Sequence, residues 1–280
     1  MVKRNGLYYL IVFLLPAFGW STQDLPWLGN FAELEWRNSM RYQTYHHLLH
    51  GKKALPYASD DQFIDSSLST AIFEYGIELE LVCAHTRKQR GIDQFKITGR
   101  YVWMDDIAGD PLSLTSGFSF IESFEPSLHD PSSFHHGRGE GELFLSLGKE
   151  FNPGYNDDEL DILGEWHARG WGVLAIGTSP TRGVPWARFI VAYDKRIGLR
   201  HEFRLFSKGL YGFGDRNLHL DDFHGYGLIR HRSVEVGFRY TYLIEFFGSA
   251  SIEYANRVYA YNFAANASQV TVEVLYTFGP

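Results

Sequence analysis

The stretch Gln269–Pro280, which reads Q-V-T-V-E-V-L-Y-T-F-G-P, sets the pattern for the whole chain. Side chains of an extended strand point alternately to its two faces. One face of this stretch is apolar and carries Val270, Val272, Val274, Tyr276 and Phe278. The other face carries Thr271, Glu273, Leu275 and Thr277. This alternation predicts an amphipathic β-strand.

The composition favours strands over helices along the rest of the chain. The 280 residues include 17 Tyr and 22 Phe but only 3 Met, and aromatic residues are typical of strands. The net charge of −7 offers no basic surface for nucleic acid. Cys83 is the only cysteine, so no disulfide can form within the chain. After the N-terminal segment no run of about 18 apolar residues occurs, which excludes a membrane protein built of helices.

The N-terminus has the plan of a secretory signal peptide. The basic head M-V-K-R-N-G precedes an apolar run from Leu7 to Leu15, which is too short for a comfortable membrane anchor. Small residues suited to cleavage follow at Ala17, Gly19 and Ser21. The chain is therefore predicted to consist of three parts: a signal peptide (1–21), a periplasmic lead-in (22–30) and a single domain (31–280).

Extended segments account for nearly all of that domain. Twelve are predicted, at approximately 31–45, 62–73, 75–87, 94–104, 111–124, 140–151, 161–178, 185–196, 199–213, 228–247, 249–263 and 268–279. Many match or exceed the roughly 9–11 residues with which a tilted strand crosses a bilayer. The first segment also allows a helical reading.

The two faces of these segments distinguish a membrane barrel from a soluble one. Ile77 and Leu79 alternate with Glu78 and Glu80, and the other long segments follow the same rule. A soluble barrel or sandwich would have to pack many large aromatic side chains into its core. A lipid-facing apolar band with a polar lumen accommodates both faces. The predicted fold is all-β, an antiparallel up-and-down transmembrane β-barrel of about 12 strands; a soluble periplasmic β-protein is the alternative.

The C-terminal strand resembles the closing strand of Gram-negative outer-membrane β-barrels, which ends in an aromatic residue. Here Gly279 and Pro280 follow Phe278. The resemblance implies a bacterial outer-membrane location, periplasmic N- and C-termini, and an assembly signal at Tyr276 and Phe278 that the barrel-assembly machinery reads. Counting backwards from a periplasmic C-terminus then predicts external loops near 46–61, 88–93, 125–139, 179–184, 214–227 and 264–267. Periplasmic turns are predicted near 74, 105–110, 152–160, 197–198 and 248.

The face opposite the apolar band carries charges of both signs. These residues are predicted to line the lumen and to tune which solutes pass: Glu78, Glu80, Lys96, Arg100, Glu142, Arg188, Arg204, Glu235, Arg239, Glu253 and Arg257. A lumen closed by its own side chains is the alternative, because a barrel of about twelve strands is narrower than a porin of 16–18 strands.

Histidines gather in the predicted external loops, beside acidic residues. Imidazole and carboxylate groups together can coordinate a transition metal. No pair has a spacing diagnostic of a metal site, so neither a metal nor a cofactor is predicted. The candidates closest to such a site are His135, His136, His219 and His224.

The chain lacks the motifs of two enzyme families with outer-membrane barrels. The twelve-stranded phospholipase carries an outward-facing His-x-Ser pair followed by Asn-Gly, whereas His231-Arg232-Ser233 is predicted to face the lumen and lacks Asn-Gly. The omptin proteases use external acidic pairs, but Asp105-Asp106 and Asp221-Asp222 are predicted on opposite sides of the membrane. An enzyme is therefore disfavoured. The sequence favours a diffusion channel for small solutes, with a non-conducting surface barrel whose loops bind a partner as the alternative.

Overall fold

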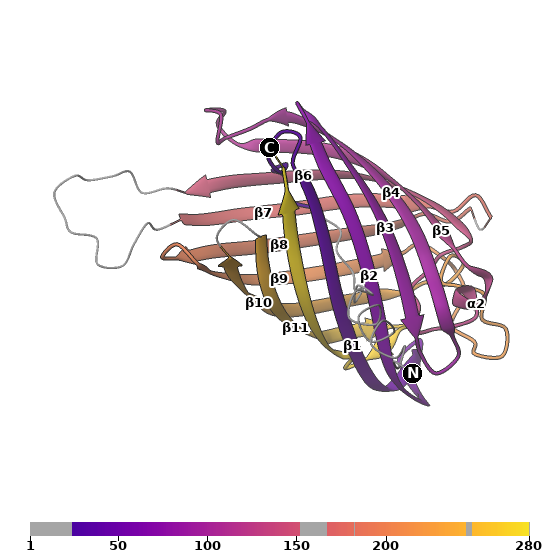
Figure 1. The fold of residues 1–280 in the computed structure, drawn as a ribbon. Helices are drawn as coiled ribbons and strands as arrows, with labels where there is room; N and C mark the ends of the chain where they lie inside the picture. The colour runs from indigo at the N-terminus through magenta and orange to yellow at the C-terminus, as the bar shows by residue number, and fades with distance from the viewer. Residues whose placement is uncertain (1–23, 152–166, 182, 245–247, 280) are drawn as a thin grey trace, which may run out of the picture.

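The computed structural model describes residues 24–151, 167–181, 183–244 and 248–279, and within them it is almost entirely strand (Figure 1). The long strands are β1 (Leu34–His50), β2 (Lys53–Ile72), β3 (Tyr75–His85), β4 (Arg90–Met104), β5 (Ser113–Ser123), β6 (Gly139–Phe151), β7 (His167–Thr178), β8 (Trp186–Ile197), β9 (His201–Gly212), β10 (Arg232–Ile244), β11 (Gly248–Tyr261) and β13 (Ser268–Phe278). A two-residue strand, β12 (Ala264–Ala265), and one short helix, α2 (Glu125–Leu128), complete the described elements.

The long strands form a closed antiparallel barrel. Each strand pairs with its neighbours in sequence, and the sheet closes because β1 pairs with both β2 and β13. Met40 of β1, for example, lies opposite Ile64 on one side and Val272 on the other. The up-and-down barrel with twelve long strands confirms the predicted fold class among the described residues.

The alternation of side chains along each strand gives the barrel an apolar outer surface and a polar inner surface. Ile77 is 51% exposed on the outside of β3, whereas the adjacent Glu78 is only 2% exposed. The C-terminal strand follows the same rule, since Val272, Tyr276 and Phe278 face outward while Glu273 is buried. An apolar outer face around a polar interior is the arrangement of a transmembrane barrel. No helix of the described residues is long and apolar enough to cross a membrane.

The prediction was wrong at the first hairpin. Residues 46–61 were expected to form an external loop, but β1 continues to His50 and β2 begins at Lys53. Gly51 turns the chain there, with a φ of 63° that suits glycine. The helical reading of the first segment is wrong too. Thr44 and Asp60 lie opposite each other in this long hairpin, so the polarity that suggested a loop belongs to paired strands.

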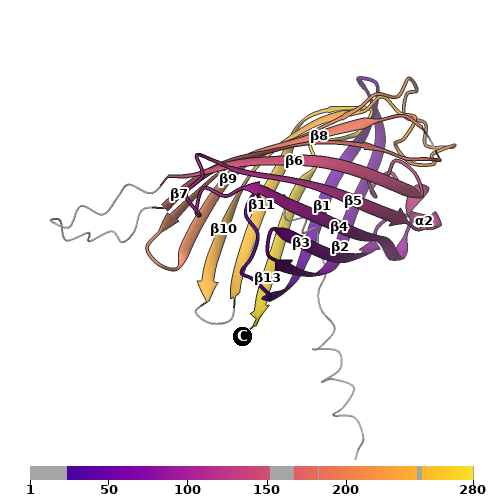
Figure 2. The same cartoon turned by 90° about the horizontal axis from the view of Figure 1, so that it is seen from above.

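The two ends of the barrel differ. At the end that carries both the start of β1 and the end of β13, short turns join β2 to β3 and β8 to β9; we call it the hairpin end. At the opposite end, residues 124–138, 213–231 and 262–267 pack together, and we call these three segments the lid. Figures 1 and 2 show α2, which is part of the lid, at the end opposite to the C-terminus. The predicted signal peptide, 1–21, lies outside the described residues, as does the predicted turn at 152–160.

Candidate functional site

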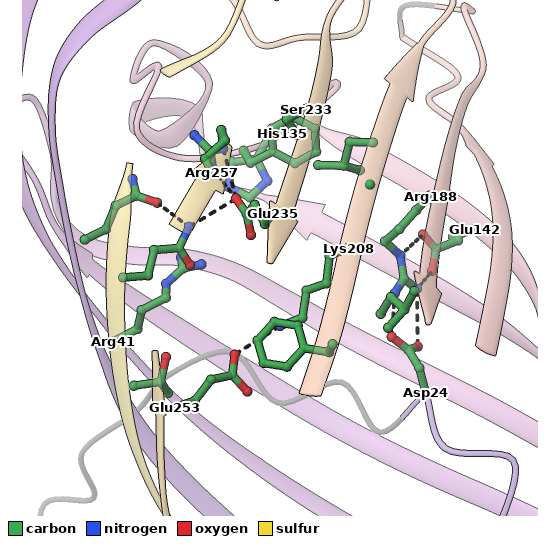
Figure 3. Close-up of a pocket in the computed structure, with 18 of the residues that line it drawn as sticks. Asp24, Arg41, His135, Glu142, Arg188, Lys208, Ser233, Glu235, Glu253 and Arg257 are labelled. Atoms are coloured by element: carbon green, nitrogen blue, oxygen red, sulfur yellow. Dashed lines mark hydrogen bonds and ion pairs between the residues drawn. The ribbon is translucent and has the colours of Figure 1, made fainter. Parts of the chain in front are cut away.

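The interior of the barrel holds a cavity of about 260 Å³ between the hairpin end and the lid. Its wall is made by inward-facing side chains of strands from around the barrel, together with Asp24 and Leu25 before β1 and Phe134 to His136 of the lid. Figure 3 shows the charged side chains converging on this space from several strands. Its polar, charged lining is the candidate site.

Ion pairs join many of the charged groups, between adjacent strands or across one intervening strand. Arg188 bonds Asp24 and Glu142, with its Nη2 atom 2.7 Å from Glu142 Oε1 (Figure 3). Arg257 Nη2 lies 2.5 Å from Glu235 Oε1, and Lys208 Nζ lies 3.1 Å from Glu253 Oε1. A buried charge is stable only when it is paired and hydrogen-bonded, so these contacts explain how the interior tolerates both signs.

The predicted lumen residues fall into two groups. Eight of them line the cavity: Lys96, Glu142, Arg188, Arg204, Glu235, Arg239, Glu253 and Arg257. The other three, Glu78, Glu80 and Arg100, are buried on the inner faces of β3 and β4 outside the cavity lining. Arg100 there donates to the Leu25 carbonyl, and Lys96 Nζ lies 3.9 Å from Glu80 Oε2. Tyr276 and Phe278, the predicted assembly signal, point outward.

Residues 24–27 enter the barrel from the hairpin end. Hydroxyl groups of the wall hold their backbone, since Ser146 donates to the Asp24 carbonyl over 2.7 Å and Thr115 donates to that of Pro26. Trp27 is buried and donates from Nε1 to Asp106 Oδ1 over 2.8 Å. Together with the ion pair from Asp24 to Arg188, these contacts narrow the lumen at this end.

A glycine of the wall makes this close approach possible. A Cβ atom at Gly148 of β6 would come within 2.5 Å of Pro26 Cγ and 2.8 Å of the Trp27 ring. Only a residue without a side chain leaves room for the segment at that height. The wall of the barrel is therefore shaped to receive residues 24–27.

The lid closes the other end with an apolar core. Buried side chains of β1 and β2, Tyr45, Leu48 and Tyr57, pack against Tyr226 and Phe263 of the lid. Hydrogen bonds tie the lid segments together, because Tyr226 donates its hydroxyl to the Pro131 carbonyl over 2.8 Å and its backbone N–H to the His135 carbonyl. Loops held in this way form an ordered cap over the cavity.

A chain of hydrogen bonds ties His135 of the lid to Ser123 of β5 and Asp93 of β4. Ser123 Oγ lies 2.8 Å from His135 Nδ1, and His135 Nε2 lies 3.1 Å from Asp93 Oδ2. Burial opposes the charged imidazole, but Asp93 and Glu140 raise the pKa of His135 above its ordinary value. Both ring nitrogens of His135 are therefore engaged, one by a hydroxyl of β5 and the other by a carboxylate of β4. The three residues form a structural clamp at the lid.

The remaining histidines and acidic residues that the sequence singled out do not come together in one site. His219 lies against His50, and His224 lies against His129 on the exposed side of the lid. No group of three or more metal-ligating side chains is present among the described residues. Ser233 lines the cavity, as the inward prediction required, while Asp106 at the hairpin end binds Trp27.

Several cavity residues were missed by the sequence prediction. Lys208 and Glu273 lie on inner faces of β9 and β13, so the same alternation would have found them. Asp24 and His136 reach the cavity from segments without a strand pattern, and no sequence signal placed them there.

Comparisons with known proteins identify proteins of similar fold but no family to which the chain can be assigned. No protein-family model matches the chain, and no characterised protein matches its sequence. Solved structures match over nearly its whole length. The outer membrane channel COG4313 from Pseudomonas putida F1 superposes with a TM-score of 0.60 over 93% of this chain and 100% of that one, at 7% identity. The chain shares its fold with outer membrane channels. The NanC porin gives a TM-score of 0.56 over 88% of this chain and 100% of that one, at 11% identity.

Proposed function

We propose that this protein is a bacterial outer-membrane channel through which small solutes diffuse. The observation that carries the proposal is the charged cavity inside a closed barrel whose outer face is apolar. An apolar band requires lipid around it, and a lumen of paired charges holds water and polar solutes. The predicted residues that line the cavity, among them Lys96, Arg204 and Arg239, would then set which solutes pass.

The proposed orientation puts the lid outside the cell and both termini in the periplasm. Outer-membrane barrels have short periplasmic turns and longer external loops, and the lid contains the long connections 124–138 and 213–231. The C-terminal strand, with Tyr276 and Phe278 outward, would be recognised by the barrel-assembly machinery in the periplasm.

Labelling of single cysteines on intact cells tests this orientation. In a Cys83→Ser background, a cysteine replaces Asp222, an exposed lid residue, or Ile107, an exposed residue of the hairpin end. A membrane-impermeant maleimide should label the Asp222→Cys protein and spare the Ile107→Cys protein until the cells are broken. The reverse pattern would overturn the orientation.

Uptake into liposomes tests the channel itself. Purified protein in liposomes should admit small sugars and amino acids, with rates that fall steeply as solute size rises, because the cavity is small. Vesicles reconstituted with heat-unfolded protein are the control. Swelling no faster than in the control, for every solute, would overturn the proposal.

A second candidate, a non-conducting surface barrel, is favoured by the lid. Its apolar core around Tyr226 covers one end of the lumen, and residues 24–27 occupy the other. The two candidates differ in one observable, since only a channel passes current across a planar bilayer.

A further inference from the structure

Two buried histidines of the lid lie side by side, and each has one ring nitrogen without a hydrogen-bond partner. His136 lies just before β6 and His231 just before β10, and their ring centroids are 5.2 Å apart. His136 is 1% exposed and His231 is 0% exposed. The Nε2 atom of each ring has no hydrogen-bond partner. Buried polar atoms are nearly always satisfied, so two such atoms on neighbouring rings require an occupant.

The second nitrogen of each ring fixes which tautomer is present. His231 Nδ1 lies 3.1 Å from the Ile229 carbonyl oxygen, which can only accept, so Nδ1 carries the proton. His136 Nδ1 lies 2.9 Å from Glu140 Oε2, a carboxylate that likewise accepts. In the neutral rings both Nε2 atoms therefore present lone pairs. Metal-ligating histidines show this arrangement, in which the other ring N–H bonds a carboxylate or a backbone carbonyl.

Aromatic side chains hold the two imidazoles in place. The Trp186 ring stacks on His136 at 4.4 Å with an interplanar angle of 4°. Phe134 packs edge-on against both rings, with centroid distances of 4.9 Å to His136 and 5.3 Å to His231. Tyr226 and Phe263 also contact His231. Ring packing of this kind prevents either imidazole from turning to another hydrogen-bond partner.

We propose that His136 and His231 bind one late first-row transition-metal ion, copper or zinc, through their Nε2 atoms. Imidazole nitrogen suits these metals, and no third ligating side chain completes a cluster among the described residues. The remaining coordination positions therefore belong to water or to small ligands from the cavity, which His136 lines. The ion joins the 124–138 segment to the 213–231 segment, so its binding stabilises the closed lid. The site does not depend on whether the lumen conducts.

Metal titration of the full protein tests the site. Untagged protein in detergent is stripped with a chelator and titrated separately with Cu²⁺ and Zn²⁺ by calorimetry. Wild type should bind one equivalent at least 100-fold more tightly than the His136→Ala/His231→Ala variant. The matched control is His129→Ala/His224→Ala, which removes an exposed histidine pair of the same lid and should keep the tight equivalent.

Two further measurements keep the test decisive if the double variant fails to fold. X-ray absorption of wild type loaded with one equivalent should show two imidazole ligands. Glu140→Gln, which keeps an acceptor for His136 Nδ1 but removes its charge, should weaken binding by about 10–100-fold. The proposal is overturned if wild type has no tight equivalent, if the exposed-pair variant loses it, or if the absorption spectrum lacks two imidazoles. A water molecule as the occupant would give the first of these results.

Discussion

The two ends of the barrel are closed by different combinations of contacts. At the lid, the closure is an apolar core in which rings such as Tyr226 and Phe263 are buried against β1 and β2. At the hairpin end, residues 24–27 combine hydrogen bonds and one ion pair to the wall with the packing of Leu25 and Trp27 against a smaller apolar cluster on the inner wall. A core of several buried rings opposes opening as a unit, whereas each polar contact of a short segment is exchanged for a contact with water at little net cost. We therefore expect the lumen to open at lower cost at the hairpin end than at the lid.

The largest effect is expected in the lid core. Tyr226→Ala removes a buried ring and its hydrogen bond to Pro131, so the free energy of unfolding should fall by about 3–5 kcal/mol. Tyr226→Phe keeps the ring and should lose only about 1 kcal/mol. Urea unfolding in detergent, followed by loss of strand circular dichroism, measures both. Equal losses for the two variants would mean that the lid is not held by apolar packing.

Loss of the Asp24 charge should release the N-terminal segment while the barrel stays folded. Asp24→Ala breaks the charge-assisted hydrogen bonds to Arg188, which contribute about 1.5–3 kcal/mol, while Arg188 keeps Glu142. Hydrogen exchange in residues 24–28 should therefore speed up by roughly 10–100-fold. Glu33→Ala, whose carboxylate bonds Asn30 outside the lumen, should leave this exchange unchanged. Unchanged exchange in the Asp24 variant would show that the ion pair does not hold the segment.

A smaller effect is expected at Trp27. Trp27→Phe preserves most of the buried ring but removes the donor to Asp106, a hydrogen bond that contributes about 0.5–1.5 kcal/mol. The same exchange measurement should show an acceleration of several-fold, below that of Asp24→Ala. An acceleration above that of the Asp24 variant would place the main anchor at Trp27 instead.

The smallest effect is a pH dependence of the same anchor. Burial opposes the Asp106 charge, but hydrogen bonds from the Glu150 N–H, Ser113 and Trp27 lower the pKa of Asp106 below its ordinary value. A carboxyl group with a lowered pKa stabilises the bound state fully above the ordinary aspartate pKa, and this stabilisation is lost as the pH falls through the lowered value. Exchange of residues 24–28, corrected for its intrinsic pH dependence, should therefore accelerate only below about pH 4. Asp106→Asn should abolish the acceleration.

The barrel was predictable from the sequence because a membrane wall repeats one rule. Strands such as Tyr75–His85 alternate apolar and charged residues, and the alternation assigns every side chain to lipid or lumen. The same rule placed Arg188 and Glu142 on the lumen side, and the structure pairs them across the intervening strand β7. It failed between 46 and 61, where polar residues of a long hairpin look like a loop.

Contacts between distant segments could not be predicted. The sequence around Asp24 has no pattern that predicts its contact with Arg188. This contact depends on the closed barrel and on the space left at Gly148. The pairing of His136 with His231 likewise depends on how the lid folds over the strands. Periodicity predicts which way the side chains of a single strand point. These contacts instead depend on how segments distant in the sequence, such as residues 24–27 and the lid, pack against the barrel.

Single-channel conductance in planar bilayers shows whether the barrel conducts and whether residues 24–27 restrict the current. We expect small, resolved openings for wild type and openings about twice as large or larger for Asp24→Ala/Trp27→Ala, because residues 24–27 narrow the lumen. Tyr226→Phe, which keeps the lid core, should conduct like wild type. An absence of openings in all three proteins, or equal openings in wild type and the double variant, would contradict this expectation.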